Sequence, residues 1–157
     1  MEWERLIRFV LLGSADFEAY AILLVRVALG LFFAISGGNK LFIPRRREAM
    51  YQTLVEGKVP FPRLMTYFVS VVEFVGGCVL AVGLLSTLTS LALLIDMLVA
   101  ILTVKLPAMR KGLSPLNWLG DFLFLPEVLY VLFFVWLIYS GPGRFSVDYW
   151  IAARLSG

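Results

Sequence analysis

Four ionisable residues, Arg26, Glu73, Asp96 and Glu127, each fall inside a long apolar stretch of the sequence. A charged side chain at the centre of a bilayer costs at least ~2.5–3.5 kcal/mol, so such residues normally face a bundle interior or an aqueous cavity. There, a carboxylate can accept or pass on a proton, and an arginine can donate hydrogen bonds to a carbonyl oxygen. The sequence therefore predicts that the protein acts inside or beside this buried polar cluster.

The elements that must position these charges are membrane helices. The chain has 157 residues, 61% of them hydrophobic, and a helix needs about 20 apolar residues to cross the hydrocarbon layer. We predict an all-α polytopic membrane protein, a compact four-transmembrane-helix bundle with short interfacial helices, forming a single membrane domain over residues 1–157. The predicted spans are 20–43, 64–85, 88–106 and 122–140.

Both ends of the chain, 1–19 and 144–157, are predicted to be interfacial tails. The apolar and basic residues of 3–12 alternate with a spacing that suits a short helix lying in the interface. The acidic start does not resemble a cleaved secretory signal. Near the other end, we expect Ser146 to cap a short amphipathic segment with Asp148 in its first turn.

The loops indicate an orientation. Loops 44–63 and 107–121 carry seven basic residues, against four on the opposite side. By the positive-inside rule both long loops lie in the cytoplasm and both termini lie outside a plasma membrane. Within the first loop, residues 48–55 are expected to form two helical turns, which Pro60 and Pro62 end.

Small and polar residues share a helical face with each buried charge. In the first span, Gly30, Ala34 and Gly38 form a ridge that allows a second helix to approach closely. Because polar and small residues fall together in three separate spans, we expect them to surround a common axis. The other residues on these faces are Phe33, Gly37, Ser70, Gly77, Thr89, Leu93, Ala100 and Thr103.

Depth along each helix predicts which charges pair. At 1.5 Å per residue, Arg26 lies about 9 Å into its span and Asp96 about 12 Å into its span from the same side. Glu127 lies about 8 Å in from the other side, near Lys40 and Lys105 at their helix ends. We therefore expect Arg26 to pair with Asp96, and Glu127 to form a structural ion pair with Lys40 or Lys105.

Glu73 has no dedicated partner in this scheme and either shares Arg26 or is protonated. An unpaired acid in the middle of a membrane has little packing value, which favours a functional role for it. The Arg26–Asp96 pair is open to two interpretations, as a ligand site or as a device that holds helix register.

Several classes of chemistry are excluded by composition. The chain has no histidine and only one cysteine, Cys78, so it holds no haem through histidine, no zinc site and no iron–sulfur cluster of its own. No metal site is predicted. With a net charge of +3 confined mainly to loops, nucleic acid is not an expected partner.

Four segments in order resemble the DoxX/DoxD-like membrane protein family: 26–42, 59–62, 73–77 and 141–148. The resemblance implies a four-helix integral membrane protein. The family takes its name from a subunit of a thiosulfate:quinone oxidoreductase, and other members are linked to redox complexes. This chain lacks the large extramembrane portion that thiosulfate oxidation would need, and it departs from the family pattern at 121–127, so thiosulfate chemistry is not carried over.

The leading hypothesis is a small membrane subunit of an oxidoreductase system that binds a quinone or a similar lipid-soluble carrier. An apolar pocket with a few convergent polar groups suits such a ligand. Arg26 or Asn39 is the predicted donor to a carbonyl group of the ligand, and Lys40 is a further predicted ligand-binding residue. Glu73 and Asp96 are the predicted proton relay, and they also line the ligand site. Electrons would come from a protein partner that carries redox centres.

Two other hypotheses remain open. Intramembrane carboxylates also serve transporters and channels for small solutes or protons, although four helices in one copy would have to self-associate. A non-catalytic scaffold or assembly factor would use the same charges only to hold its helices together.

Overall fold

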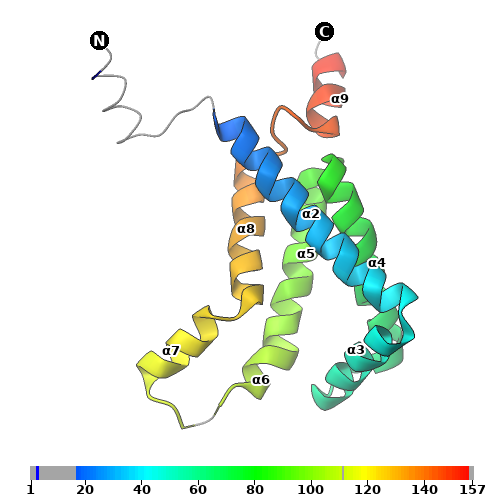
Figure 1. Ribbon diagram of the computed structural model, residues 1–157, viewed down its shortest axis with the longest axis vertical. Helices are drawn as coiled ribbons and strands as arrows, with labels where there is room; N and C mark the ends of the chain where they lie inside the picture. Colours follow the sequence, from blue (N-terminus) through cyan, green and yellow to red (C-terminus); the bar gives the residue numbers. More distant parts are fainter. Residues whose placement is uncertain (1–2, 4–16, 111, 156–157) are drawn as a thin grey trace.

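The computed structural model describes residue 3 and residues 17–110 and 112–155. Every regular element within them is a helix (Figure 1), which confirms the all-α prediction. Three helices are long and apolar enough to cross a membrane, and a bent pair makes up to four. The predicted interfacial helix at 3–12 lies outside the described residues, apart from Trp3.

The first two long helices, α2 (Glu18–Phe42) and α4 (Pro62–Val82), are packed backbone against backbone. A Cβ on Gly30 would lie 2.6 Å from the backbone nitrogen of Ala81, and a Cβ on Gly37 or Gly77 would also overlap the facing backbone. A Cβ on Gly38 would meet side chains alone, the Phe74 ring at 3.3 Å and the Phe42 ring at 3.9 Å. The predicted small-residue contact is present, with Gly37 rather than Gly38 in the close approach, and glycine makes it possible.

The third long helix runs over Ser86–Ala108 and changes its winding partway. It consists of α5 (Ser86–Ala100), the π-helical turn η2 (Ile101–Lys105) and α6 (Leu106–Ala108). It lies beside α8 (Pro126–Ser140) as well as α4 (Figure 1). A core of fully buried side chains forms where these helices meet α2, and its largest members are Phe33, Phe134, Leu80 and Leu93.

The fourth predicted span, 122–140, is two helices in the structure. α7 (Pro115–Leu123) and α8 meet at an angle of 63°. Pro126 begins α8, and Leu125 before it is extended with ψ of 124°. Proline lacks an N–H and disfavours helical geometry in the preceding residue, so a continuous helix through this point is not available.

Two shorter helices flank the bundle at its opposite ends (Figure 1). α3 (Pro44–Glu56) extends the predicted turns of 48–55 in both directions, because Pro44 suits the first helical position. α9 (Val147–Leu155) follows the cap predicted at Ser146, whose Oγ accepts a hydrogen bond from the Tyr149 N–H at 3.0 Å. The interfacial placement of both helices remains a prediction.

Candidate functional site

The last turns of α2 bring a lysine onto the buried carboxylate of α4. Lys40 Nζ donates to both oxygens of Glu73, at 2.7 and 2.6 Å, and Ser36 Oγ donates to Glu73 Oε2 at 3.2 Å. Glu73 is only 4% exposed. The expectation that Glu73 has no dedicated partner is therefore wrong. Lys40 was misassigned because it was placed at the helix end, while its long side chain reaches back along the bundle.

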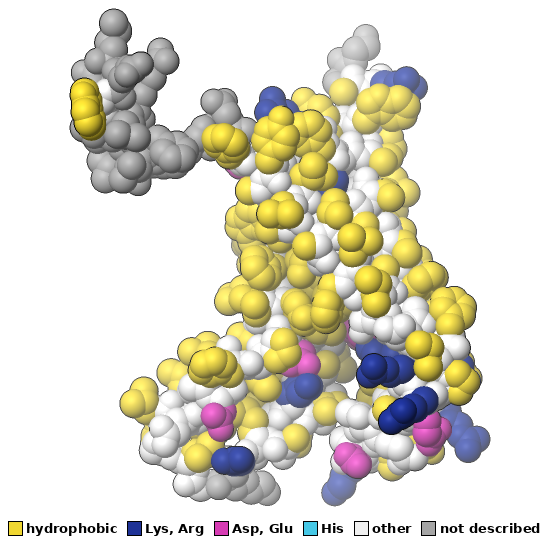
Figure 2. Space-filling model, viewed as in Figure 1, with side chains coloured by type: hydrophobic (Ala, Val, Ile, Leu, Met, Phe, Trp, Pro, Cys, Tyr) yellow, Lys and Arg dark blue, Asp and Glu magenta, His cyan; other side chains and the backbone are white. Residues whose placement is uncertain are grey.

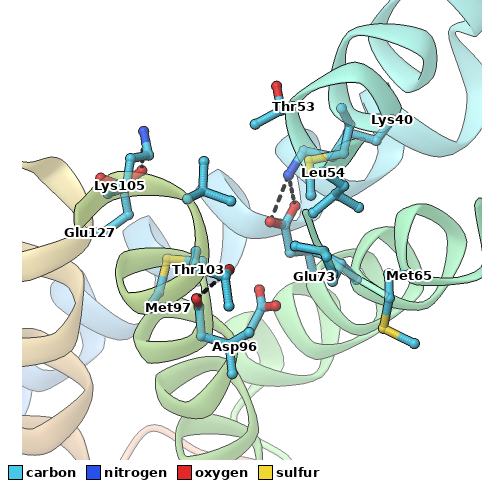
Figure 3. Close-up of a pocket in the computed structure, with 16 residues that line it drawn as sticks. Lys40, Thr53, Leu54, Met65, Glu73, Asp96, Met97, Thr103, Lys105 and Glu127 are labelled. Carbon is cyan, nitrogen blue, oxygen red and sulfur yellow. Dashed lines mark hydrogen bonds and ion pairs between the residues drawn. The ribbon is translucent and has the colours of Figure 1, made fainter. Parts of the chain in front are cut away.

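This ion pair borders a cavity of about 230 Å³ (Figure 3). The cavity lies between α3 and α4 on one side and α5 with η2 on the other. Most of its wall is apolar, and charged groups enter it at a few points, which is the usual build of a small-molecule site. The apolar lining consists of Met50, Leu54, Val59, Met65, Val69, Met97, Val99, Ala100 and Val104.

Asp96 projects into the same cavity from α5 (Figure 3). Its Oδ2 is buried and has no hydrogen-bond partner within residues 17–110 and 112–155. Burying a polar atom without a hydrogen bond costs free energy, and native proteins seldom leave such an atom unexplained. An unsatisfied carboxylate oxygen in a cavity wall is a position at which a ligand's polar group can bind.

A second ion pair stands at the rim of the cavity. Lys105 Nζ lies 2.8 Å from Glu127 Oε1, which confirms the predicted structural pair. Lys105 is the last residue of η2, and π-helical turns inside longer helices are frequent at functional sites. Glu127 Oε2 is buried and lacks a hydrogen-bond partner in the described part of the chain. The cavity thus offers a second open acceptor.

Asn39 lies outside this cavity. It lines an adjoining, more open groove of about 460 Å³ between α2 and α3. Lys40, Met50 and Thr53 line both spaces. Asn39 therefore stands in a space that adjoins the cavity rather than in the cavity wall.

The predicted pair of Arg26 with Asp96 is wrong. Arg26 is 1% exposed and lies at the other end of the bundle, where Nη1 donates to Pro142 O at 2.9 Å and Nη2 to Phe145 O at 2.6 Å. The depth estimate placed both residues from assumed helix ends and ignored the diagonal course of α2 across the bundle (Figure 1). It also ignored the loop after α8, whose carbonyl groups accept from both terminal nitrogens of Arg26, while Nε has no partner among the described residues.

That loop, 141–148, is held on its other side by the turn between α4 and α5. Asp148 accepts hydrogen bonds from the N–H groups of Leu85 at 2.6 Å and Ser86 at 2.7 Å, so it caps the start of α5. Gly83 has φ of +77° and lies directly against the Arg26 guanidinium and Ser146. We call Arg26, Gly83 and the 141–148 loop the clasp.

Sequence reasoning missed the partners in the clasp and the apolar wall of the cavity. The sequence predicts a cap at Ser146 and a family resemblance over 141–148, but not the contact of this segment with Arg26, because backbone carbonyl groups leave no trace in residue types. The lining residues Met50, Leu54 and Met97 carry no distinguishing signal in a chain so rich in apolar side chains. Of the predicted ligand residues, the cavity brings together Lys40, Glu73 and Asp96.

Comparison with known proteins agrees with this architecture. The family model described as DoxX matches residues 21–106. The uncharacterised membrane protein Rv3486 of Mycobacterium tuberculosis is 30% identical over 142 residues, covering 85% of this chain and 83% of that protein. CatD of Bacillus subtilis, provisionally named an oxidoreductase, is 29% identical over 97 residues, covering 62% and 69%. No solved structure matches the chain significantly.

Proposed function

The chain belongs to the DoxX family of membrane proteins, and we propose that it is a small membrane subunit of an oxidoreductase system that binds a quinone or a similar lipid-soluble carrier. One observation carries the proposal: the apolar cavity presents the unpartnered Oδ2 of Asp96 beside the Lys40–Glu73 pair. A ligand that combines an apolar ring with polar carbonyl oxygens matches that combination.

The size of the cavity fits the head of such a carrier. At about 230 Å³ it is smaller than the roughly 300–1,000 Å³ that encloses a drug-sized ligand. It has room for a substituted ring, while an isoprenoid tail would extend into lipid. The flexible thioethers of Met50, Met65 and Met97 adapt readily to the outline of a bound ring.

Each charged residue has a role in the proposal. Lys40 has a third N–H beyond the two that serve Glu73, and it donates to a carbonyl oxygen of the ligand. Asp96, when protonated, donates to the ligand's other carbonyl oxygen, and Asp96 and Glu73 exchange protons with the ligand. Asn39 lines the adjoining groove, and Arg26 takes no part because the clasp already uses it.

The carrier supplies the redox chemistry, because a quinone accepts two electrons and two protons on reduction. The chain contains no histidine and one cysteine, so we propose that a protein partner with its own redox centres exchanges electrons at this site. The oxidoreductase name of the Bacillus subtilis relative supports this class of function.

We further propose a plasma-membrane location with both termini outside. The support is the excess of basic residues in loops 44–63 and 107–121. In that orientation the cavity, which lies at the end of the bundle that carries α3 and η2, is on the cytoplasmic side.

The packing does not favour a transport pathway through one copy of the chain. Between the cavity and the Arg26 end, the fully buried side chains of Phe33, Leu93 and Phe134 fill the interior. A scaffold without a ligand is likewise less well supported, because it gains nothing from the unpaired oxygens of Asp96 and Glu127.

The test is binding of a short-tailed quinone to the purified protein. Asp96→Leu removes the carboxyl group without breaking any hydrogen bond of the described structure. A hydrogen bond between neutral partners contributes about 0.5–1.5 kcal/mol, so we expect quinone affinity to fall roughly 2- to 12-fold. Asp121→Leu, on α7 and exposed, is the matched control and should retain the affinity of the original protein.

The readout combines isothermal binding with mass spectrometry of the lipids that copurify. Near-stoichiometric quinone in the original protein and a smaller amount in Asp96→Leu would support the proposal. If no quinone binds, or if Asp96→Leu binds it unchanged while folding normally, the proposed function is wrong.

A further inference from the structure

A third cavity, away from the site described above, lies between the start of α4 and α3. We propose that it binds the phosphate headgroup of an anionic phospholipid. This groove has a volume of about 400 Å³. Its lining residues are Arg47, Glu48, Tyr51, Arg63, Thr66 and Tyr67. The inference does not depend on the proposed redox function.

Both arginines of the groove rest on tyrosine rings. The Arg47 guanidinium lies 5.4 Å from the centre of the Tyr67 ring, and that of Arg63 lies 5.9 Å from the centre of the Tyr51 ring. The two contacts cross between the helices, since Arg47 and Tyr51 belong to α3 and the other two to α4. A side chain held against a ring loses less freedom on binding, and its planar N–H fork matches phosphate oxygens.

Neither guanidinium is neutralised within the protein. Across residues 17–110 and 112–155, no carboxylate lies within 4.0 Å of Arg47 or Arg63, and the ion pairs there are those of Lys40 and Lys105. Arg47 Nη1 donates to Leu41 O at 3.0 Å, which positions it without cancelling its charge. Glu48 lines the groove, but its carboxylate accepts from Gln52 Nε2 at 2.7 Å along the helix.

The surroundings supply a positive field. Arg45, Arg46 and Lys58 are exposed close by in the chain, and the space-filling view shows basic side chains gathered over the α3 end of the molecule (Figure 2). Basic residues next to a membrane attract anionic lipids by about 1 kcal/mol each, and basic pockets between helices bind their headgroups.

An apolar strip explains why the ligand is a lipid rather than free phosphate. Leu64, Phe68, Val71 and Val75 follow one another along the face of α4 that continues from Arg63 and Tyr67, and all four are exposed. A phospholipid with its phosphate in the groove can lay its acyl chains along this strip. Tyrosines at the junction suit the boundary between headgroups and hydrocarbon.

The experiment is native mass spectrometry of the detergent-purified protein with dioleoyl-phosphatidylglycerol or dioleoyl-phosphatidylcholine. Two arginines at about 1 kcal/mol each predict a roughly 30-fold preference for phosphatidylglycerol. Arg47→Gln with Arg63→Gln should reduce that preference to less than about threefold. The matched control, Arg45→Gln with Lys58→Gln, removes the same charge at the same end of the molecule but outside the groove, and it should lose much less of the preference because both groove arginines remain.

Each of the following outcomes would contradict binding of a phospholipid in the groove. An equal loss in the control would mean that a diffuse positive field, rather than the groove, selects the lipid. Competition by inorganic phosphate at the concentration of the lipid would identify free phosphate as the ligand. The double variant could fail to fold, because Arg47 also holds the end of α2. In that case Arg63→Gln alone is tested, and its preference for phosphatidylglycerol should fall about fivefold. An unchanged preference in Arg63→Gln would contradict binding in the groove.

Discussion

The two ends of the bundle treat their buried charges differently. In the clasp, both terminal nitrogens of Arg26 donate to carbonyl oxygens and the guanidinium lies directly against Gly83, so that Nε alone lacks a partner among the described residues. At the other end, Asp96 faces a cavity with one oxygen unpartnered among the described residues. Both residues lie inside apolar helices, so their residue types alone would suggest equal importance.

The difference separates a structural charge from a candidate ligand site. A charged side chain that donates to fixed backbone carbonyl groups holds helices and a loop together. Its removal leaves those carbonyl groups without hydrogen-bond donors. A carboxylate that faces empty space costs stability, so its presence favours a role in binding. If this distinction is right, substitutions in the clasp reduce stability, whereas Asp96 can be replaced at no structural cost.

The largest effect is expected at Gly83. In Gly83→Ala the new Cβ would lie 2.6 Å from Arg26 Cζ and 2.7 Å from Ser146 Cβ, and φ is +77°. Overpacking and left-handed strain together should lower the free energy of unfolding by about 3–5 kcal/mol, measured by SDS titration in mixed micelles. Gly112→Ala is the control, because φ there is +84° and nothing lies within 4 Å, so it should lose only about 1–2 kcal/mol. Equal losses would show that the clasp is not tightly packed.

The second largest loss of stability is expected on breaking the Lys40–Glu73 ion pair. Lys40→Met leaves the buried Glu73 without a cation, and since the lysine side chain is 20% exposed we expect a loss of about 2–3 kcal/mol in the same titration. Adding Glu73→Gln should restore most of it. Lys105→Met breaks a pair whose lysine is 37% exposed and should cost less than about 1 kcal/mol. A double variant no more stable than Lys40→Met would contradict a dedicated pair.

Asp148 tests the other half of the clasp. Asp148→Ala removes the acceptor of the Leu85 and Ser86 N–H groups and should lower the thermal unfolding free energy in detergent by about 1–2 kcal/mol. Asp121→Ala, at an exposed position of α7, should have no measurable effect. A loss at Asp148 no larger than that at Asp121 would mean that the loop does not stabilise α5.

The smallest effect on stability is expected at Asp96. Replacing an unsatisfied buried carboxylate by an apolar side chain of similar size should leave the unfolding free energy within about 0.5 kcal/mol or raise it. Asp96→Leu should therefore melt at or above the temperature of the original protein. A loss beyond about 1 kcal/mol would place Asp96 with the structural charges and remove the contrast between the two ends.

Local features of the sequence predicted much of this molecule. The apolar runs predicted the long helices, and Ser146 followed by Asp148 predicted the start of α9. The ridge of Gly30 and Ala34 predicted a close helix contact, and Lys105 with Glu127 predicted an ion pair. These succeed because each depends on neighbours along one helix or on residues near the same membrane surface.

The residues that face inward were determined by the sequence itself, since helical periodicity places Arg26, Glu73 and Asp96 on faces that share small residues. Which of them meet was decided only in three dimensions. The tilt of α2 and the length of the Lys40 side chain place that lysine against Glu73. The 141–148 loop returns to the bundle and places its carbonyl groups against Arg26. Asp96 remains beside the cavity because pairing depends on where whole helices and loops lie, and one-dimensional spacing does not specify that position.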